Sequence, residues 1–402
     1  MDIKATSLDF GPMHERMDHY VQQNILSCCA TLVMQGQDIV DYKTFGYMDL
    51  ETKTPLREDA IYRMYSNTKI VTSVALMMLY EEGLFDLDDP LAKFMPQFDG
   101  LSVLKPDAKT AQDVVPAEQM ILIRHILSHS AGFSYGFIEP ESVIDQAYLQ
   151  GGLNVLADSS IELEEFCDRV ARLPLAYEPG TSWRYSVATD VCARLVEVLS
   201  GMAFDEFLQQ RIFAPLGMPD TDFWVPPEKA SRFITQYAPT DLFDPMKPGL
   251  VKADDPVAGQ YNKKRALLSG GGGLVSTVAD YVRFLQMIVG GGERQGVRLL
   301  KPATLELMRT NQLAAGVSVA FPMWAMPGTT FGLGFALKES LQERDPAIAK
   351  DEYHWGGMAG THSWMAPNAG ITGFCLTQRM PGFWHPFSHE FKAMAYDIAG
   401  TG

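Results

Sequence analysis

Two short motifs in this 402-residue sequence are typical of a serine that attacks a carbonyl carbon. Ser66 and Lys69 belong to a Ser-Asn-Thr-Lys run, which matches the S-x-x-K pattern of a serine assisted by a lysine. Ser134 is the centre of a Gly-Phe-Ser-Tyr-Gly run, which matches the G-x-S-x-G pattern of a nucleophile elbow. Both patterns predict a covalent acyl intermediate on the serine oxygen, but the two assignments exclude each other.

The context of Ser134 disfavours a nucleophile elbow. Such an elbow joins a buried strand to a helix that starts at the serine. Residues 120–127, which precede the motif, have apolar residues whose spacing fits one face of a helix better than a strand. Residues 138–141, Ile-Glu-Pro-Glu, do not continue as a helix from the serine, and no HGGG-type oxyanion segment precedes it. We therefore favour a chance match in a Gly/Ser-rich loop.

The S-x-x-K pattern occurs a second time, at Ser102 and Lys105, and roughly one chance match is expected in a chain of this length. Ser102 lies in a predicted loop between two prolines. Ser66 instead follows a strand-like run at residues 61–65 and opens a pattern over 66–82 that is apolar nearly all round. That pattern predicts a buried helix, and it favours Ser66 as the functional copy.

At the start of a helix, Ser66 and Lys69 are suited to nucleophilic catalysis. Residues i and i+3 share one helix face, so Lys69 can lie beside the Ser66 hydroxyl. The helix N-terminus also presents a free backbone N–H and the positive end of the helix dipole, which would stabilise an oxyanion formed at Ser66. The tetrapeptide alone leaves one alternative open, namely that Ser66 is an ordinary N-cap.

A serine–lysine pair needs a base and a second oxyanion donor. Lysine and tyrosine both have reference pKa values of about 10, too high for a free base at neutral pH. A lysine ammonium held against a tyrosine favours the phenolate, and Tyr185, after a turn at 178–180, is the candidate. The second donor could come from residues 354–358, His-Trp-Gly-Gly-Met, because two glycines permit close backbone approach. The alternatives are an ordinary half-buried aromatic at Tyr185 and a glycine-containing strand bulge at 356–357.

The hydrophobic pattern separates the chain into sheet-forming ends and a helical middle. The pattern at 28–50 predicts an antiparallel hairpin, and strand-like runs recur at 331–337 and 371–377. Strands at both ends with helices between them predict one α/β core interrupted by an all-helical insertion. The predicted helices cover residues 12–27, 66–82, 118–127, 162–172, 189–200, 204–213, 274–288 and 393–399.

The charge and the cysteines exclude several function classes. The chain has 33 basic and 49 acidic residues, and this net charge of −16 argues against nucleic-acid or membrane binding. The five cysteines are an odd number without a C-x-x-C pair, so we expect neither a disulfide framework nor a zinc site. His385 and His389 have helix-like spacing, but Pro386 intervenes and no third ligand is evident, so we expect no metal there. No signal peptide and no apolar run near ~20 residues is found, which predicts a soluble cytoplasmic protein.

Several segments together resemble one superfamily, that of the serine β-lactamases and penicillin-binding proteins. The similarity is closest to the class C β-lactamases and to their esterase relatives, the family VIII carboxylesterases. The resemblance extends over residues 15–395, and the motifs are specific as a set although most are weak singly. It rests on residues 65–69 with the helix after them, and on 82–90, 123–132, 178–186, 212–218, 271–277 and 331–335.

The resemblance implies an α/β (α+β) serine β-lactamase-like fold, in which an antiparallel sheet is flanked by helices and interrupted by an all-helical insertion domain. The α/β domain would comprise residues 1–84 and 260–402, and the mainly helical domain residues 85–259. The resemblance further implies that Ser66 is the acylated nucleophile, that Lys69 and Tyr185 are its proton-transfer pair, and that no metal or cofactor is needed. The other implied site residues are the backbone N–H groups of Ser66 and Met358 in the oxyanion hole, and Tyr135, Trp355, Gly356 and Gly357 in the substrate pocket.

Two departures from the β-lactamase pattern bear on the substrate. Val187 stands where those enzymes carry the asparagine of Tyr-x-Asn, and Trp355 stands where they carry the lysine of Lys-Thr-Gly. Those polar groups hold the amide and the carboxylate of a β-lactam, so their loss favours neutral esters, and Trp-Gly-Gly is also what the esterase family carries. We therefore predict a carboxylesterase that hydrolyses short-chain acyl esters, a small-molecule substrate, through an acyl-enzyme on Ser66. The alternatives are a β-lactamase, a D-amino-acid peptidase or an acyltransferase with the same site, and a sensor or scaffold with an inactive site.

Overall fold

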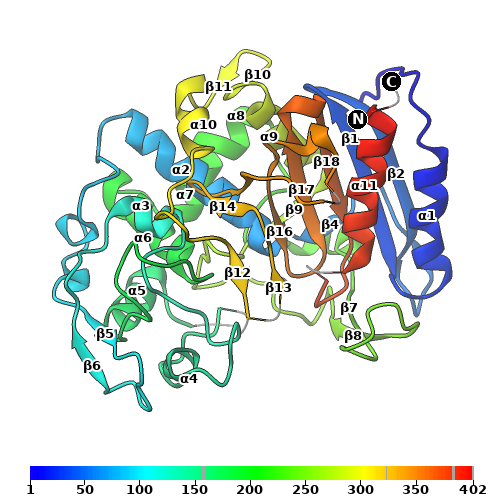
Figure 1. Ribbon diagram of the computed structural model, residues 1–402. Helices are drawn as coiled ribbons and strands as arrows, with labels where there is room; N and C mark the ends of the chain where they lie inside the picture. Colours follow the sequence, from blue (N-terminus) through cyan, green and yellow to red (C-terminus); the bar gives the residue numbers. More distant parts are fainter. Residues whose placement is uncertain (156–159, 323, 344, 383–384, 401–402) are drawn as a thin grey trace.

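The computed structural model describes residues 1–155, 160–322, 324–343, 345–382 and 385–400. Its centre is an eight-stranded sheet of antiparallel pairs in the order β14-β15-β16-β17-β18-β1-β2-β3 (Figure 1), which confirms the expected antiparallel sheet. The two ends of the chain meet in this sheet, where β1 pairs with β18 and Thr31 lies opposite Cys375. The strands are β1 (Cys28–Gln35), β2 (Asp38–Asp49), β3 (Thr54–Pro55), β14 (Thr329–Phe331), β15 (Ala336–Lys338), β16 (Tyr353–Gly357), β17 (Thr361–Ala366) and β18 (Ile371–Leu376).

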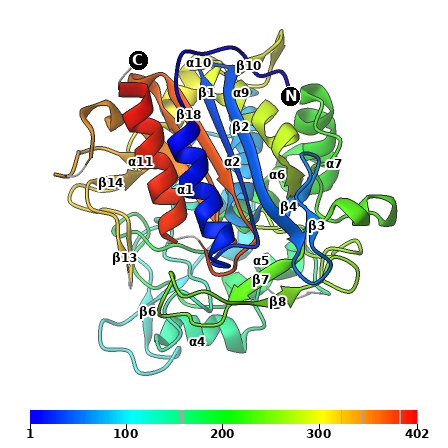
Figure 2. The same cartoon turned by 90° about the vertical axis from the view of Figure 1, so that its right-hand side faces the viewer.

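Helices α1 (Gly11–Gln22) and α11 (Pro386–Gly400) lie side by side over one face of the sheet (Figure 2). Their buried side chains form one apolar cluster with Trp364 of β17. Helix α1 is shorter than predicted because Asn24 adopts a φ of 54°, which a right-handed helix excludes. Helix α11 is longer than predicted because it begins at Pro386, and proline is tolerated in the first helical turn.

Helix α2 (Thr68–Glu81) belongs to the core on the opposite face of the sheet. Alternate residues of a strand point to opposite faces. Cys29 and Val33 of β1 accordingly join the cluster beneath α1 and α11, whereas Ala30 and Leu32 join the cluster that contains α2. Every residue of α2 from Thr68 to Leu79 is buried, which confirms the predicted buried helix.

The middle of the chain contains several short helices, and helix α6 packs against α2. It is not all-helical as the sequence pattern predicted, because β5 (Ser102–Leu104) pairs with β6 (Val114–Pro116) and β7 (Gln236–Pro239) pairs with β8 (Leu250–Asp254). The helix predicted over 118–127 is wrong in its first half. Leu122 forms a β-bridge with Pro90, which keeps this segment extended, so the helix begins only at Ile123. The helix predicted over 204–213 changes to a π-helical turn at Gln209–Phe213. The helices of this region are α3 (Ile123–Leu127), α4 (Val143–Gln150), α5 (Leu163–Ala171), α6 (Ala188–Ser200), α7 (Phe204–Leu208) and α8 (Ala214–Leu216).

Strand β9 (Val275–Thr277) was not expected, because the sequence pattern predicts a helix from residue 274. Strand β9 pairs with β4 (Ile61–Arg63), and this pairing delays the start of helix α9 (Val278–Val289). The Thr277 side chain caps α9 by accepting the Asp280 N–H at 3.1 Å. The single strand predicted over 331–337 is likewise a hairpin of β14 and β15.

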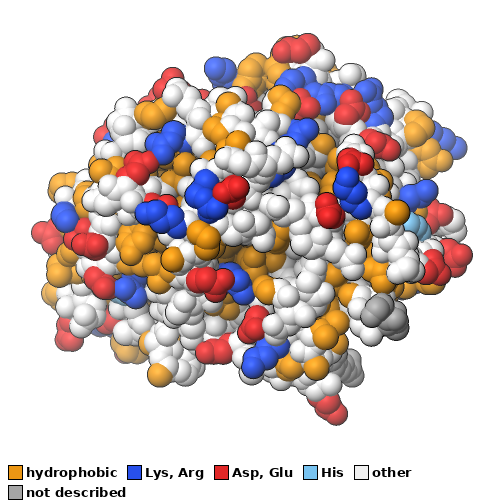
Figure 3. Space-filling view, turned by 90° about the horizontal axis from the view of Figure 1, so that it is seen from above, with side chains coloured by type: hydrophobic (Ala, Val, Ile, Leu, Met, Phe, Trp, Pro, Cys, Tyr) orange, Lys and Arg blue, Asp and Glu red, His pale blue; other side chains and the backbone are white. Residues whose placement is uncertain are grey.

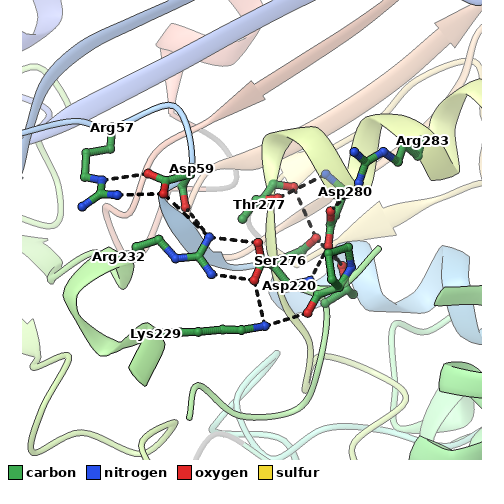
Figure 4. A network of polar contacts seen from close by, with 11 residues as sticks. Arg57, Asp59, Asp220, Lys229, Arg232, Ser276, Thr277, Asp280 and Arg283 are labelled. Carbon is green, nitrogen blue, oxygen red and sulfur yellow. Dashed lines mark hydrogen bonds and ion pairs between the residues drawn. The ribbon is translucent and has the colours of Figure 1, made fainter. Parts of the chain in front are cut away.

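A network of ion pairs fixes the β4–β9 ladder that leads to Ser66 (Figure 4). Arg232 donates to Asp220 at 2.9 Å and to the backbone oxygen of Asp59 at 3.2 Å. Asp280 accepts the backbone N–H of Asp220 at 2.6 Å. Asp59 precedes β4 and Asp280 follows β9, so the network holds both strands at the same end of the ladder.

Charged side chains of both signs are interspersed on the face seen in Figure 3. No helix in the described part of the chain is long and apolar enough to cross a membrane. All five cysteines are buried and free.

The division into an α/β domain of residues 1–84 with 260–402 and a mainly helical domain of residues 85–259 stays a prediction. Short elements complete the fold: β5 (Ser102–Leu104), β6 (Val114–Pro116), β7 (Gln236–Pro239), β8 (Leu250–Asp254), β10 (Glu293–Arg294), β11 (Val297–Arg298), α10 (Pro302–Met308), β12 (Ala320–Phe321) and β13 (Trp324–Ala325).

Candidate active site

Ser66 lies in a tight turn between a strand and a buried helix. The turn Tyr65–Asn67 follows β4 and leads directly into α2, so Ser66 is presented at the N-terminal end of that helix. Tyr65 has a φ of 44°, a left-handed conformation that is uncommon for a bulky residue. Such a conformation persists where neighbouring contacts enforce it. The Met64 N–H, for example, donates to the Leu274 carbonyl at 2.9 Å.

Asn67 fixes this turn to the central sheet. Its Nδ2 donates to the side-chain oxygen of Thr361 at 2.9 Å and to the Thr361 carbonyl at 3.0 Å. Its Oδ1 accepts from the Ser363 hydroxyl at 2.9 Å, and both partners lie on β17. All three side chains are fully buried, so a lost hydrogen bond here has no replacement from water. Asn67 therefore positions Ser66, a role that nothing in the S-x-x-K pattern indicated.

Lys69 is buried and directs its amine toward Ser66. The Nζ atom lies 3.4 Å from Ser66 Oγ, as the i, i+3 spacing suggested. Two closer partners are the carbonyl oxygen of Gly271 at 2.6 Å and the hydroxyl of Tyr135 at 2.9 Å. Three partners match the three hydrogens of an ammonium group, so the site can hold Lys69 in its charged form.

Tyr185 approaches Ser66 from the helical region. Its hydroxyl is hydrogen-bonded to Ser66 and accepts the indole N–H of Trp355 at 3.2 Å. The Lys69 amine lies 4.5 Å from the centre of the Tyr185 ring. The structure thus brings the three predicted residues together, with Lys69 and Tyr185 each in contact with the Ser66 hydroxyl.

Burial decides which of these groups can act as a base. It lowers the pKa of Lys69 to about 7, against the attraction of Asp190, because a low-dielectric interior disfavours the ammonium. Burial raises the pKa of Tyr185 above its usual value, against its hydrogen bonds with Ser66 and Trp355, because the interior equally disfavours a phenolate. At neutral pH the accessible base is therefore the Lys69 amine, whereas the sequence argument favoured a Tyr185 phenolate.

A small cavity of about 40 Å³ opens beside Ser66. Tyr135, Tyr185 and Met358 contribute to its wall together with Gly271. By the same measure one water molecule needs about 10 to 15 Å³, so this cavity has room for a small reacting group. A larger cavity of about 580 Å³ beside α5 and α6 has no serine, cysteine or histidine among the described residues of its wall, so it carries no comparable chemistry.

The Trp-Gly-Gly segment was predicted to line the substrate pocket, but Trp355, Gly356 and Gly357 are not among the described residues that line this cavity, whereas the next residue, Met358, is. Trp355 is buried and contacts Tyr185, and Gly356 pairs with His362 in the sheet. A Cβ atom at Gly357 would overlap the carbonyl oxygen of Met64, so glycine lets β16 approach the turn of Ser66 closely. Gly357 therefore allows two backbone segments to lie in close contact, whereas the sequence argument expected the two glycines to let the backbone approach a ligand.

Ser134, the centre of the G-x-S-x-G match, has a structural environment. It is fully buried, accepts from Arg184 Nε at 2.7 Å and donates to Asp145. Asp145 and Arg184 also form an ion pair at 2.8 Å. Its neighbour Tyr135 is the residue of this motif that reaches Lys69.

The sequence argument missed Asp190 and the role of Gly271. Asp190 is fully buried in the first turn of α6 and accepts the Gly271 N–H at 3.0 Å. The available signal was the spacing Tyr185 to Asp190, which places an acidic residue at the start of the helix that follows the tyrosine. In the described part of the chain, no cluster of histidine, cysteine, aspartate or glutamate side chains could hold a metal ion.

Comparisons with known proteins identify the family and the fold of the chain. Protein Rv1367c of Mycobacterium tuberculosis is 31% identical over 344 residues, which cover 85% of this chain and 80% of that protein. Esterase EstB of Burkholderia gladioli is 27% identical over 397 residues, or 94% of this chain and 93% of EstB. The solved structure of EstCE1, a hydrolase with promiscuous acyltransferase activity, has the same fold, with a TM-score of 0.80 and 24% identity over 95% of this chain and 97% of that one. The Beta-lactamase family profile matches residues 13–392, and the chain therefore belongs to the Beta-lactamase family.

Proposed function

We propose that the chain is a serine carboxylesterase that hydrolyses short-chain acyl esters through an acyl-enzyme on Ser66. The observation that carries this proposal is the contact of Ser66 Oγ with both Lys69, at 3.4 Å, and the Tyr185 hydroxyl. One group can accept a proton from the serine while the other supplies one to the leaving group. The similarity to Esterase EstB over nearly the whole chain supports the same reaction class.

Acylation begins when Ser66 Oγ attacks the ester carbonyl carbon and transfers its proton to the neutral Lys69 amine. The oxyanion that forms is stabilised by the backbone N–H groups of Ser66 and Met358. When the carbon–oxygen bond of the ester breaks, the leaving alkoxide takes a proton from Tyr185. Tyr185 regains a proton from the Lys69 ammonium, so the amine is neutral again and the acyl group remains on Ser66.

Deacylation repeats these steps with water in place of the alcohol. Water takes the position that the alcohol has left, loses its proton to the same pair of groups and attacks the acyl carbon. The acid leaves when Ser66 Oγ is reprotonated. An alcohol that entered in place of water would receive the acyl group, so the acyltransferase alternative differs only in the acceptor.

The site supports a neutral substrate with a small acyl group. The asparagine and lysine that would hold a β-lactam are replaced by Val187 and Trp355, and the Trp355 indole N–H donates a hydrogen bond to the Tyr185 hydroxyl. The cavity beside Ser66 is only about 40 Å³, so a short acyl chain fits it best. The buried, free cysteines are compatible with the reducing cytoplasm that we propose as its location.

The test compares p-nitrophenyl acetate and butyrate hydrolysis by wild type, Ser66→Ala and Ser134→Ala. We expect Ser66→Ala to lose at least a thousandfold in kcat, as nucleophile removal does in serine hydrolases (about 10⁶-fold in one worked case), whereas Ser134→Ala keeps the activity of its folded fraction. Ser102→Ala is the matched control at the second S-x-x-K pattern. Activity that survives in Ser66→Ala, or nitrocefin turnover that equals ester turnover, would overturn the proposal.

A further inference from the structure

Asp190 is a buried carboxylate that the acyl-transfer steps above do not use. Its Oδ1 accepts from the Ser269 hydroxyl at 2.6 Å and from the Gly271 N–H at 3.0 Å. Its Oδ2 is buried and has no hydrogen-bond partner in the part of the chain that the structure describes. An unpaired carboxylate oxygen is costly in an apolar interior, so its position beside the lysine of the site requires an explanation.

Gly271 joins Asp190 to Lys69. Its N–H binds the carboxylate, and its carbonyl oxygen accepts from the Lys69 amine at 2.6 Å. A Cβ atom at this position would lie 2.7 Å from Asp190 Oδ2 and 2.8 Å from the Tyr135 hydroxyl, closer than real Cβ contacts. The carboxylate, the tyrosine hydroxyl and the peptide of Gly271 are therefore packed around one point, which only glycine can occupy without displacement.

Lys69 and Asp190 are two buried groups of opposite charge, and each favours the charged form of the other. The attraction of Asp190 opposes the burial that lowers the pKa of Lys69, and Lys69 in turn opposes the burial that raises the pKa of Asp190. The other titratable groups that face Lys69 or Asp190 are one histidine, two tyrosines and two cysteines. Burial lowers the pKa of the histidine and raises the pKa values of the tyrosines and cysteines, so all five are neutral at pH 7. They are His129, Tyr135, Tyr185, Cys167 and Cys192.

We propose that Asp190 is a positioning residue of the Ser66 site, which holds the Gly271 carbonyl against the Lys69 amine and balances the ammonium that forms when Ser66 transfers its proton. The inference rests on the proposed function. Each acyl transfer creates a cation at a fully buried position, and a buried cation without a counter-charge is strongly destabilised. Asp190 provides that counter-charge without contacting the substrate.

The experiment uses Asp190→Asn, which keeps the size of the side chain and one acceptor oxygen but removes the charge. The pH dependence of kcat and kcat/KM is measured on p-nitrophenyl acetate. Without the carboxylate the ammonium is less stable, so the acid limb set by Lys69 should move to lower pH by about 1 unit. The plateau of kcat should fall about tenfold or more at an almost unchanged KM, because the cation is needed only during proton transfer.

Two further variants separate this role from a structural one. Asp145→Asn removes another fully buried carboxylate, one paired with Arg184 and not with Lys69, and should leave the acid limb where wild type has it. Ser269→Ala removes the hydroxyl that donates to Asp190 without deleting a charge. Because that hydrogen bond stabilises the carboxylate, its loss should move the limb in the same direction as Asp190→Asn but less far.

The results distinguish the inference from the proposed function. An acid limb that stays in place in both Asp190→Asn and Ser269→Ala overturns the inference, even if both variants are slower. Where Asp190→Asn fails to fold, as judged by its thermal transition, Ser269→Ala alone decides. If Ser66→Ala hydrolyses the ester as fast as wild type does, the proposed function is overturned instead. The role of Asp190 is then tested independently by the pH dependence of the rate at which a serine-directed phosphonate labels Ser66.

Discussion

The neighbouring glycines Gly271 and Gly272 offer a sharp test of the packing around Lys69. A Cβ atom at Gly271 would lie 2.7 Å from Asp190 Oδ2 and 2.8 Å from the Tyr135 hydroxyl. Ordinary contacts begin at 3.4 Å, so Gly271→Ala forces a displacement of about 0.7 Å, shared among the Asp190 carboxylate, the Tyr135 hydroxyl that contacts Lys69 and the Gly271 peptide whose carbonyl holds the Lys69 amine. At Gly272 the nearest atom, in the Tyr65 backbone, is 3.7 Å away, so Gly272→Ala is accommodated without movement.

A misplacement of about 1 Å near reacting groups costs about 100-fold in rate, so Gly271→Ala should lose roughly 10- to 100-fold in kcat/KM. That loss corresponds to about 1.4 to 2.7 kcal/mol in the activation free energy. Overpacking should also lower the free energy of unfolding by about 1 to 3 kcal/mol. Gly272→Ala, without a close contact, should stay within about twofold in kcat/KM.

The assay is kcat/KM on p-nitrophenyl acetate, together with urea unfolding of the same preparations. Neither glycine has a positive φ, so the two substitutions differ in the space available and not in backbone strain. If Gly271→Ala keeps wild-type kcat/KM, or if Gly272→Ala is equally impaired, the steric reasoning is refuted.

Three further predictions concern protons and buried contacts. Because burial lowers the pKa of Lys69 to about 7, kcat/KM should rise through pH 7 as one proton is lost and then level off, and a profile flat from pH 5 to 9 would contradict this. Burial lowers the folded pKa of six histidines below the unfolded value of about 6.5, so their contribution to stability is complete above that pH; three of the six alone should cost about 4 kcal/mol at pH 5.5, and a urea midpoint that does not change from pH 8 to 5.5 would refute it. Burial lowers the pKa values of these three to about 3 for His354 and about 4 for His385 and His389. Asn67→Ala should cost about 2 kcal/mol of unfolding free energy, measured beside the exposed control Asn368→Ala, and equal midpoints for the two would contradict the role of Asn67 in holding the turn.

The sequence predicted the parts of the fold that depend on local spacing. The apolar pattern that follows Ser66 was sufficient for a buried helix, and residues three apart on a helix share a face whatever surrounds it. The β1–β2 hairpin followed from two apolar stretches that are separated only by a turn at residues 35–38, so the two strands are neighbours in the sequence. Boundaries were less accurate where a distant partner intervenes. The bridge of Leu122 to Pro90 and the pairing of β9 with β4 each convert predicted helix into extended chain.

The same division applies to the site. The sequence by itself determined that Ser66 and Lys69 are neighbours, because residues i and i+3 lie on the same face of any helix. Only the tertiary structure decided that Ser134 is bonded to Asp145 and Arg184, that Tyr135 reaches Lys69, and that Asp190 lies against Gly271. These contacts join segments far apart in the chain, and burial, which shifts the pKa of Lys69 toward 7, exists only once those segments have packed together.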